Sequence, residues 1–392
     1  MNTLQIPKII ARNIVEQAGN GIPPKNGYQY YTVGIDKLVQ AIDKEYLETF
    51  IKQGGSSFKI VLGHYGEGKT HFLYVIENIA KENNYVTSFI NLSMEETPFH
   101  KIELVYKKIV QNLEIQNSLE KGISIIITKW LKEKIEQGIS DDVLLAEIDS
   151  MPIEYHNYKI IIKNAIKYLL KNEEDVYEEV ILPLLLGEGL SKRDIKDYGI
   201  YETLNNKNAF SWFRSLIQFI KSIGYSGIVV LFDEAEPVSS LSSKDKSKLL
   251  NNLRLLIDEA ATSNLPSCMI FYAVPDLNFL EGRDYTYQAL SQRIKGDGQY
   301  LNELIPQANV LNLELIVKNE DFYKELSNKL KSIYEVAYDY QFSEEENQKI
   351  QEEVDKMVLD LLNSVIEEGF KRKFIRNYIH LLNKLRNNKN KV

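Results

Sequence analysis

One glycine-rich segment restricts the folds open to this chain more than any other feature of the sequence. Residues 63–70 read Gly-His-Tyr-Gly-Glu-Gly-Lys-Thr, which fits the pattern glycine, four residues, glycine, lysine, threonine. An apolar run at 58–62 precedes it, and apolar residues at helical spacing follow from Phe72 to Ile79. A strand that delivers the loop and a helix whose N-terminus receives phosphates are what this motif requires. The segment therefore predicts a P-loop that binds a nucleoside triphosphate.

The residues of this loop have separate predicted roles. Gly63, Gly66 and Gly68 let backbone N–H groups turn inward around the phosphate oxygens. Lys69 is expected to reach the β- and γ-phosphates, and the Thr70 hydroxyl is expected to hold Mg²⁺. The segment predicted to contact the nucleotide also includes Tyr65, Glu67 and His71.

The second motif of the predicted site is an acidic segment that follows a strand expected to be buried. Residues 227–232 form an uninterrupted apolar run, typical of a central parallel strand covered on both faces. Asp233 and Glu234 come next, and ligands gather at the carboxyl ends of strands in an open α/β sheet. We expect Asp233 to orient Mg²⁺ or its waters, and Glu234 to take a proton from the attacking water. Glu236 has no assigned role.

The composition favours a soluble enzyme of the cytoplasm. The chain has 392 residues, of which 44 % are apolar, so it can build a sizeable core. Its single cysteine, Cys268, lies in an apolar run and is expected to be buried, which excludes a disulfide framework. Apolar stretches are too short for a membrane span. The net charge of −8 argues against a broad nucleic-acid-coating surface but allows a local basic patch.

The order of patterns predicts an α/β core with a parallel sheet flanked by helices, interrupted by a helical insert and followed by a helical lid. Strands are predicted at 58–62, 85–92, 227–232, 268–274 and 309–315, with no strand-like run between 100 and 222. The proposed divisions are an N-terminal helical segment (1–57), the first half of the core (58–113), the insert (114–210), the second half of the core (211–318) and the lid (319–392).

The lid contains the most regular helical pattern. Ser343 and Glu346 have the spacing of a capping box, and apolar residues recur from Ile350 to Val365 before Gly369 ends the helix. We interpret this stripe as core packing. A last helix follows and begins with the basic residues 371–373.

Two arginines are candidates for contact with the γ-phosphate. Arg293 ends a helix between the fourth and fifth predicted strands, from which an arginine can reach the triphosphate of a neighbouring subunit. Arg372 opens the last lid helix and is expected to contact phosphates within its own chain. The alternative for each, on the residues alone, is a surface arginine in a polar helix.

Together these features resemble the AAA+ ATPases of the origin-recognition branch, in the order of core, insert, Asp-Glu strand, arginine and lid. The chain is more similar still to the ATP-binding proteins of BREX phage-defence loci, both the smaller D component and the P-loop part of the larger C component. The segments that carry this resemblance are 31–34 (Tyr-Thr-Val-Gly), 46–47, 65–73 (Tyr-Gly-Glu-Gly-Lys-Thr-His-Phe-Leu), 224–227, 233–236 and 371–376.

The resemblance implies Mg-ATP binding, a role in defence against phage or other foreign DNA, and action through partner proteins encoded nearby. It also implies a homo-oligomer in which Arg293 is the arginine finger, with Arg372 as the sensor of the lid. Two hypotheses remain open. One is an ATPase motor or loader that engages DNA without sequence specificity, driven by hydrolysis at Asp233 and Glu234. The other is a nucleotide-held scaffold that hydrolyses very slowly and assembles partners while ATP is bound.

Two residues depart from the family pattern. Val274 stands before the proline that ends strand 268–274, where the family has a polar residue that hydrogen-bonds the γ-phosphate, and Tyr272 is a poor substitute because side chains alternate along a strand. Glu67 occupies a loop position that is normally small and neutral. A carboxylate there would repel the triphosphate by about 1 kcal/mol or more at surface-like dielectric, so Glu67 must point outward. Val274 and the net negative charge of the chain favour the scaffold hypothesis, whereas Glu234 favours the ATPase motor.

Overall fold

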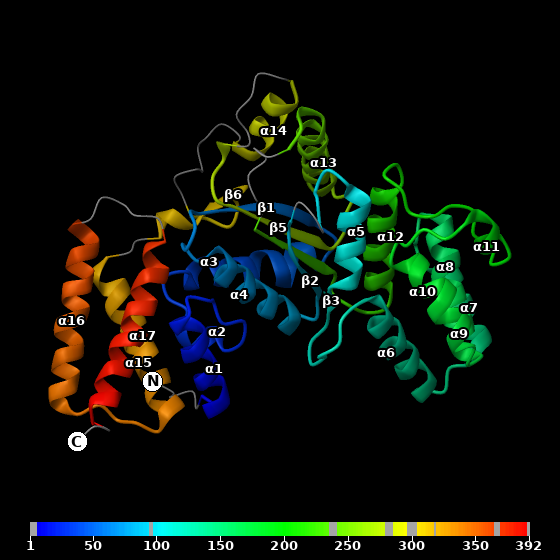
Figure 1. The fold of residues 1–392 in the computed structure, drawn as a ribbon. Helices are drawn as coiled ribbons and strands as arrows, with labels where there is room; N and C mark the ends of the chain where they lie inside the picture. Colours follow the sequence, from blue (N-terminus) through cyan, green and yellow to red (C-terminus); the bar gives the residue numbers. More distant parts are fainter. Residues whose placement is uncertain are drawn as a thin grey trace.

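A mostly parallel six-stranded sheet forms the centre of the protein (Figure 1). The computed structural model describes residues 6–93, 97–234, 241–278, 285–295, 304–316, 319–363 and 369–389. The strands are β1 (Ser56–Leu62), β2 (Val86–Asn91), β3 (Leu113–Glu114), β4 (Ile228–Asp233), β5 (Cys268–Val274) and β6 (Val310–Asn312). Their order is β3-β2-β4-β5-β1-β6, and only β2 and β3 pair in the antiparallel sense. This is the α/β fold with a P-loop core that the sequence predicts.

Strand β5 separates the strand that precedes the glycine-rich loop from the strand that carries the acidic pair. Its register pairs Val274 with Leu62 of β1 and Tyr272 with Phe232 of β4. Because all three strands run in the same direction, the loop and Asp233 emerge at the same edge of the sheet. The topology therefore brings together two motifs that are far apart in the sequence.

Helices cover both faces of the sheet. The N-terminal part supplies α1 (Lys8–Gly19), α2 (Tyr28–Tyr31), α3 (Asp36–Ala41), the π-helix η1 (Ile42–Ile51) and, after β1, α4 (Lys69–Glu82). The later core supplies α5 (Ile102–Gln111), α12 (Ala209–Ser222), α13 (Ser243–Ala261) and α14 (Tyr285–Lys295).

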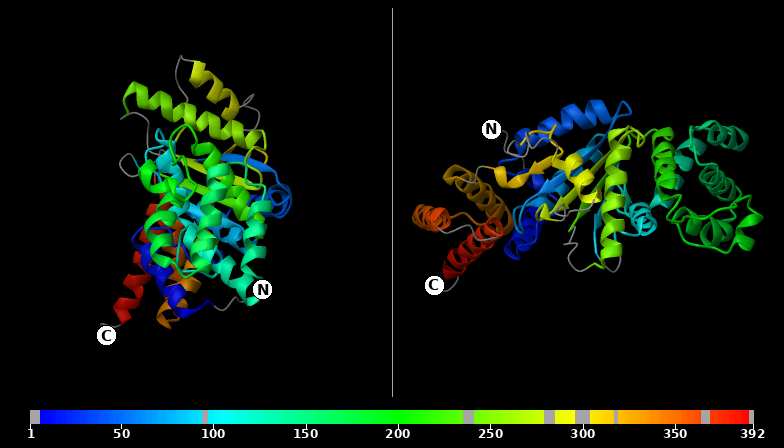
Figure 2. Two further views of the ribbon diagram at one scale, coloured as in Figure 1. Left: turned by 90° about the vertical axis from the view of Figure 1, so that its right-hand side faces the viewer. Right: turned by 90° about the horizontal axis from the view of Figure 1, so that it is seen from above.

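The two remaining groups of helices lie at opposite ends of the core (Figures 1 and 2). Between β3 and α12 the chain forms α6 (Ile123–Glu136), α7 (Asp141–Ser150), α8 (His156–Leu170), α9 (Glu174–Val176), η2 (Tyr177–Ile181), α10 (Leu182–Leu185) and α11 (Lys192–Lys196). After β6 it forms a 3-10 turn, η5 (Leu313–Leu315), and then the lid helices α15 (Glu320–Tyr338), α16 (Glu344–Asn363) and α17 (Phe370–Lys389). The division of the chain into five segments stays a proposal.

Alternating side chains of the strands enter two separate apolar cores. Ile60, Val230 and Ile270 belong to a core that includes α5, α12, α13 and the helices of the insert. Their neighbours Val61 and Leu231 belong to a second core that includes the N-terminal helices, α4 and the lid. Since successive residues of a strand point to opposite faces, the sheet is the boundary between the two cores.

The strands lie close to the predicted positions, with two corrections. Residues 313–315 form a 3-10 turn and not the end of a strand, because the side chain of Asn312 accepts a hydrogen bond from the Glu314 N–H (3.0 Å) and turns the chain. The segment 100–222 does contain a strand, β3, which is only two residues long and pairs with Thr87 and Ser88. So short a strand leaves no pattern that alternation could reveal.

Several predictions about single residues are confirmed. The Glu346 N–H donates to Ser343 Oγ (3.3 Å) and the Ser343 N–H donates to Glu346 Oε2 (2.8 Å), which completes the capping box. Ile350 is buried, as is Cys268. Val365 and Glu236 lie outside the described residues. Within the described part of the chain, every helix is too short or too polar to cross a membrane.

We predict that Gly227→Ala destabilises the sheet strongly. Gly227 has φ of +147°, and an added Cβ would lie 2.0 Å from the carbonyl oxygen of Ser267, which accepts the Ile228 N–H at the start of the β4–β5 pairing. The free energy of unfolding, measured in urea, should fall by about 3 kcal/mol. The control is Gly189→Ala, since no described atom lies within 4 Å of its Cβ position. An equal fall in both variants would contradict the prediction.

Candidate functional site

The glycine-rich loop passes directly into the first turn of α4. Gly66 and Gly68 have φ values of +84° and +97°, in the left-handed region that favours glycine. Gly68 precedes the helix, and its carbonyl accepts the Phe72 N–H at 2.9 Å. The first N–H groups of α4 have no partner within the helix, and together with the helix dipole they favour an anion at this end.

Lys69 is held over the loop that it follows. Its Nζ donates to the carbonyl oxygens of Gly63 (2.5 Å) and His64 (3.2 Å). Burial lowers the pKa of Lys69, and the charge of Asp233 acts against this shift. The ammonium group therefore donates to carbonyl oxygens of the loop, and the oxygens of a bound triphosphate can replace these as acceptors.

Thr70 and Asp233 meet across the end of the sheet. The Thr70 hydroxyl donates to Asp233 Oδ2 at 2.6 Å, although 163 residues separate the two in the sequence. Asp233 is 2 % exposed, whereas Glu234 is exposed and has φ of +54°. A non-glycine residue in this conformation is uncommon and is often found at functional sites. The turn at Glu234 keeps both acidic residues in the wall of one cavity.

This cavity has a volume of about 540 Å³, within the range of sites for small molecules. The part of its lining that comes from the loop, α4, the end of β4 and the start of α17 is called the polar end below: Tyr65, Gly66, Gly68, Lys69, Thr70, His71, Asp233, Glu234, Lys371 and Arg372. The part that comes from the N-terminal segment and the lid helices is mostly apolar and is called the apolar end: Ile22, Pro23, Pro24, Tyr31, Val33, Phe322, Leu326, Leu330 and Ile375. The arrangement fits a molecule with an anionic part and a flat apolar part.

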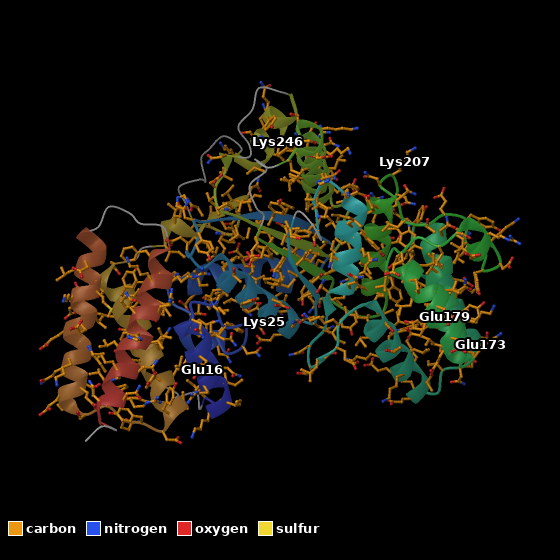
Figure 3. The ribbon with its side chains drawn as sticks, viewed as in Figure 1. Glu16, Lys25, Glu173, Glu179, Lys207 and Lys246 are labelled. Atoms are coloured by element: carbon orange, nitrogen blue, oxygen red, sulfur yellow. The ribbon has the colours of Figure 1, made fainter. Side chains whose placement is uncertain are left out.

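The apolar end is built by the N-terminal segment together with the lid. An ion-pair network fixes the N-terminal segment: Lys25 Nζ lies 3.2 Å from Glu77 Oε1 on α4, and Lys81 Nζ lies 2.8 Å from the same oxygen. Figure 3 shows Lys25 near the middle of the molecule, between the N-terminal helices and the insert. The Glu77 side chain has no exposed surface, so its buried charge depends on these ion pairs, and the two lysines also pair with Glu114.

The lid contacts the loop directly. A Cβ added at Gly66 would lie 2.6 Å from the Cα of Gly369, so the two backbones touch. The Arg372 guanidinium lies 4.4 Å from the centroid of the Tyr65 ring and also donates a hydrogen bond to the Tyr65 hydroxyl. Arg372 therefore lines the cavity, and its contact with phosphates stays a prediction.

His71 joins α4 to the N-terminal segment. Its Nε2 lies 3.0 Å from Thr32 Oγ1, and its ring centroid lies 4.8 Å from that of Tyr31. Burial lowers the pKa of His71 to about 3, and the charge of Lys371 adds to the shift. At neutral pH this ring is uncharged and serves to hold the wall of the cavity.

Near the loop, the structure corrects the predicted position of one glutamate and adds another that the sequence did not reveal. Glu67 does not line the cavity, yet it is 8 % exposed, so its side chain is packed within the protein and does not point outward into solvent. Glu314 follows β6 and accepts a hydrogen bond from the His64 N–H at 3.0 Å. Sequence reasoning missed Glu314, because only the β1–β6 pairing brings it beside the loop.

Arg293 lies away from the cavity of its own chain. It is on α14, where it forms an ion pair with Asp258 of α13 and donates to the carbonyl oxygen of Ala289 (2.9 Å). Figure 1 shows α13 and α14 together above the sheet, well separated from the lid helices. The structure thus gives Arg293 an intrachain partner, and its role toward a neighbouring subunit stays a prediction.

The end of β5 offers the cavity no polar side chain among the described residues. Ala273 and Pro275 line the cavity, and Val274 between them is 2 % exposed. Tyr272 and Val274 both belong to the core on the opposite side of the sheet from Ala273, where the Tyr272 ring lies 5.3 Å from Phe99. The alternation of side chains therefore places Tyr272 on the same face as Val274, contrary to the argument made from the sequence.

The donors at the polar end suit a hard divalent cation. The described residues include no cluster of three or more histidine, cysteine, aspartate or glutamate side chains that could hold a metal. The Thr70 hydroxyl and the Asp233 carboxylate provide two oxygen ligands, and Mg²⁺ is usually held in this way, with water and phosphate oxygens as its other ligands. The residues present therefore fit Mg²⁺ bound together with a triphosphate.

The parallel sheet, the glycine-rich loop and the acidic end of β4 define a P-loop nucleotide-binding protein. A family model described as BREX system ATP-binding protein BrxC/D matches residues 6–392. The chain belongs to this family, as the resemblance in the sequence indicated. None of the curated proteins compared with the chain matches it.

We predict that Gly66→Ala weakens ATP binding. The added Cβ would displace Gly369, and the lid would then carry Arg372 away from the polar end of the cavity. The Kd for ATP, measured by isothermal titration calorimetry, should rise on the order of tenfold, or about 1.4 kcal/mol. The matched control is Gly54→Ala, which also has a positive φ (+102°) but no described atom within 4 Å. An unchanged Kd in the Gly66 variant would show that the lid contact is unimportant for binding.

Proposed function

We propose that this protein is a Mg²⁺-dependent ATPase that couples ATP binding and hydrolysis to the assembly of partner proteins, or to engagement of DNA, in BREX phage defence. Its membership of a family of BREX system ATP-binding proteins supports the ligand and the setting. The observation that carries the proposal of hydrolysis is the 2.6 Å hydrogen bond between Thr70 and Asp233, with Glu234 in the wall of the same cavity.

The residues of the polar end have complementary tasks in this proposal. Lys69 and the N-terminus of α4 bind the phosphates and stabilise charge that develops on them during transfer. Thr70 and Asp233 hold Mg²⁺, which when bound neutralises charge on the phosphate oxygens. Glu234 orients the attacking water and accepts its proton. Arg372 reaches the triphosphate from the lid.

The proposal includes a homo-oligomer in which Arg293 acts on the nucleotide of a neighbouring copy. Its support is the position of Arg293 on α14, at the edge of the core and outside the cavity of its own chain. To act as a finger, the guanidinium must leave its ion pair with Asp258, so subunit contact and active-site completion are linked.

A nucleotide-held scaffold is the second candidate, and the end of β5 favours it. In place of a hydrogen-bonding side chain, this strand presents Ala273 and Pro275 to the cavity. With no polar contact from β5 to the γ-phosphate, ATP can be bound tightly while hydrolysis remains slow, and the bound state can organise partners.

We predict that the purified protein hydrolyses ATP and that Glu234→Gln abolishes turnover while ATP binding is retained. Steady-state turnover, measured with and without duplex DNA, separates the two candidates. Turnover that rises with DNA and is lost in Glu234→Gln establishes a DNA-coupled ATPase. Turnover no higher than in Glu234→Gln, with ATP still tightly bound, establishes the scaffold.

We also predict that Thr70→Val removes most of the effect of Mg²⁺ on ATP affinity, because it keeps the size of the side chain but lacks the hydroxyl that meets Asp233. The Kd for a non-hydrolysable ATP analogue should rise on the order of tenfold in Mg²⁺ and change little in EDTA. Thr70→Ser, which keeps the hydroxyl, is the control and should behave as the unaltered protein. Equal weakening under both conditions would assign Thr70 a role other than holding the metal.

A further inference from the structure

We infer that Lys371 is a second phosphate-binding cation contributed by the lid, which binds the α- and β-phosphates while Arg372 binds the γ-phosphate. This inference rests on the proposed nucleotide site and adds to it a way for the lid to hold both ATP and ADP.

The start of α17 points two consecutive cations at the cavity. The helix begins at Phe370, immediately after Gly369, whose backbone touches Gly66 of the loop. Lys371 and Arg372 both line the cavity, whereas Lys373 in the same turn is exposed and does not. The lid contact at Gly66 therefore fixes the position of both cations relative to the phosphate site.

Lys371 lies where the polar end of the cavity meets the apolar end. A Cβ added at Gly68, the last residue before α4, would lie 3.4 Å from Lys371 Nζ. On the apolar side, the same Nζ lies 5.0 Å from the centroid of the Phe322 ring. A nucleotide with its base against the apolar wall and its phosphates in the loop places the α- and β-phosphates at this boundary.

Arg372 takes a different position along the loop. Its guanidinium stacks on the ring of Tyr65, which is 64 % exposed at the outer rim, and its aliphatic stem packs beside Gly21 of the N-terminal segment. The two lid cations thus lie beside different residues of the loop, Lys371 beside Gly68 and Arg372 beside Tyr65. On this basis we assign them to different phosphates of the bound nucleotide.

The different positions of Lys371 and Arg372 predict different effects on the affinity for ATP and for ADP. ADP lacks the γ-phosphate and so loses the contact with Arg372, but it keeps the phosphates that Lys371 contacts. Loss of Lys371 should weaken both nucleotides by the same factor, and loss of Arg372 should weaken ATP selectively.

The test is isothermal titration calorimetry of the full-length protein with a non-hydrolysable ATP analogue and with ADP, both in Mg²⁺. In Lys371→Ala we expect both Kd values to rise on the order of tenfold, with their ratio unchanged. In Arg372→Ala the Kd for the ATP analogue should rise by a similar factor, and the Kd for ADP should change by less than about threefold. Lys373→Ala, a lysine from the same turn, is the matched control, and Lys371→Arg should restore binding because it restores the charge.

Two results would overturn the inference: unchanged Kd values in Lys371→Ala, or a loss restricted to the ATP analogue, which would place both cations at the γ-phosphate. Melting temperatures equal to that of the unaltered protein exclude unfolding as the cause of weakened binding. If the unaltered protein binds neither nucleotide, the proposed function fails together with this inference. If it binds both and Lys371→Ala also binds both normally, only the inference fails.

Discussion

The burial of β1, β5 and β4 on both faces is the constraint on which the rest of the structure depends. β4 and β5 are apolar along almost their whole length, and β1 is apolar except at Ser56, Ser57 and Lys59, so successive side chains require covering layers on alternate sides of the sheet. Helices before, between and after the strands supply those layers. Because the strands are parallel, this packing also brings the glycine-rich loop and Asp233 to one edge, where their polar groups meet.

The cavity depends on segments that belong to three different parts of the chain. The core supplies the polar end through the loop, α4 and β4, but the apolar end requires Tyr31 from the N-terminal segment and Phe322 and Ile375 from the lid. Close backbone contact at Gly66 and Gly369 and the buried charges around Glu77 hold these parts together. A nucleotide that fills both ends would therefore stabilise the joined arrangement over any in which the lid is apart.

Features formed by a few adjacent residues could be predicted from the sequence, whereas contacts between distant segments could not. The loop, the acidic end of β4 and the capping box at Ser343 each carry their geometry in a few adjacent residues. The structure brings Thr70 of the loop against Asp233 of β4, and separately it forms the capping box at the start of α16. Glu314 reaches the loop only because β6 pairs with β1, and Arg372 meets Tyr65 only because the lid folds back. Such contacts depend on tertiary packing, which a single sequence does not encode as a pattern.

Because the sheet separates the two apolar cores, the insert can accept substitutions that the helices around the nucleotide cavity cannot. The insert rests on one face of the sheet, while the lid and the N-terminal helices that form the nucleotide cavity rest on the other. Substitutions that reshape the outer helices of the insert therefore leave the residues around the cavity in place. Such a chain can acquire a new binding surface on the insert while the residues proposed to bind and hydrolyse the nucleotide keep their positions.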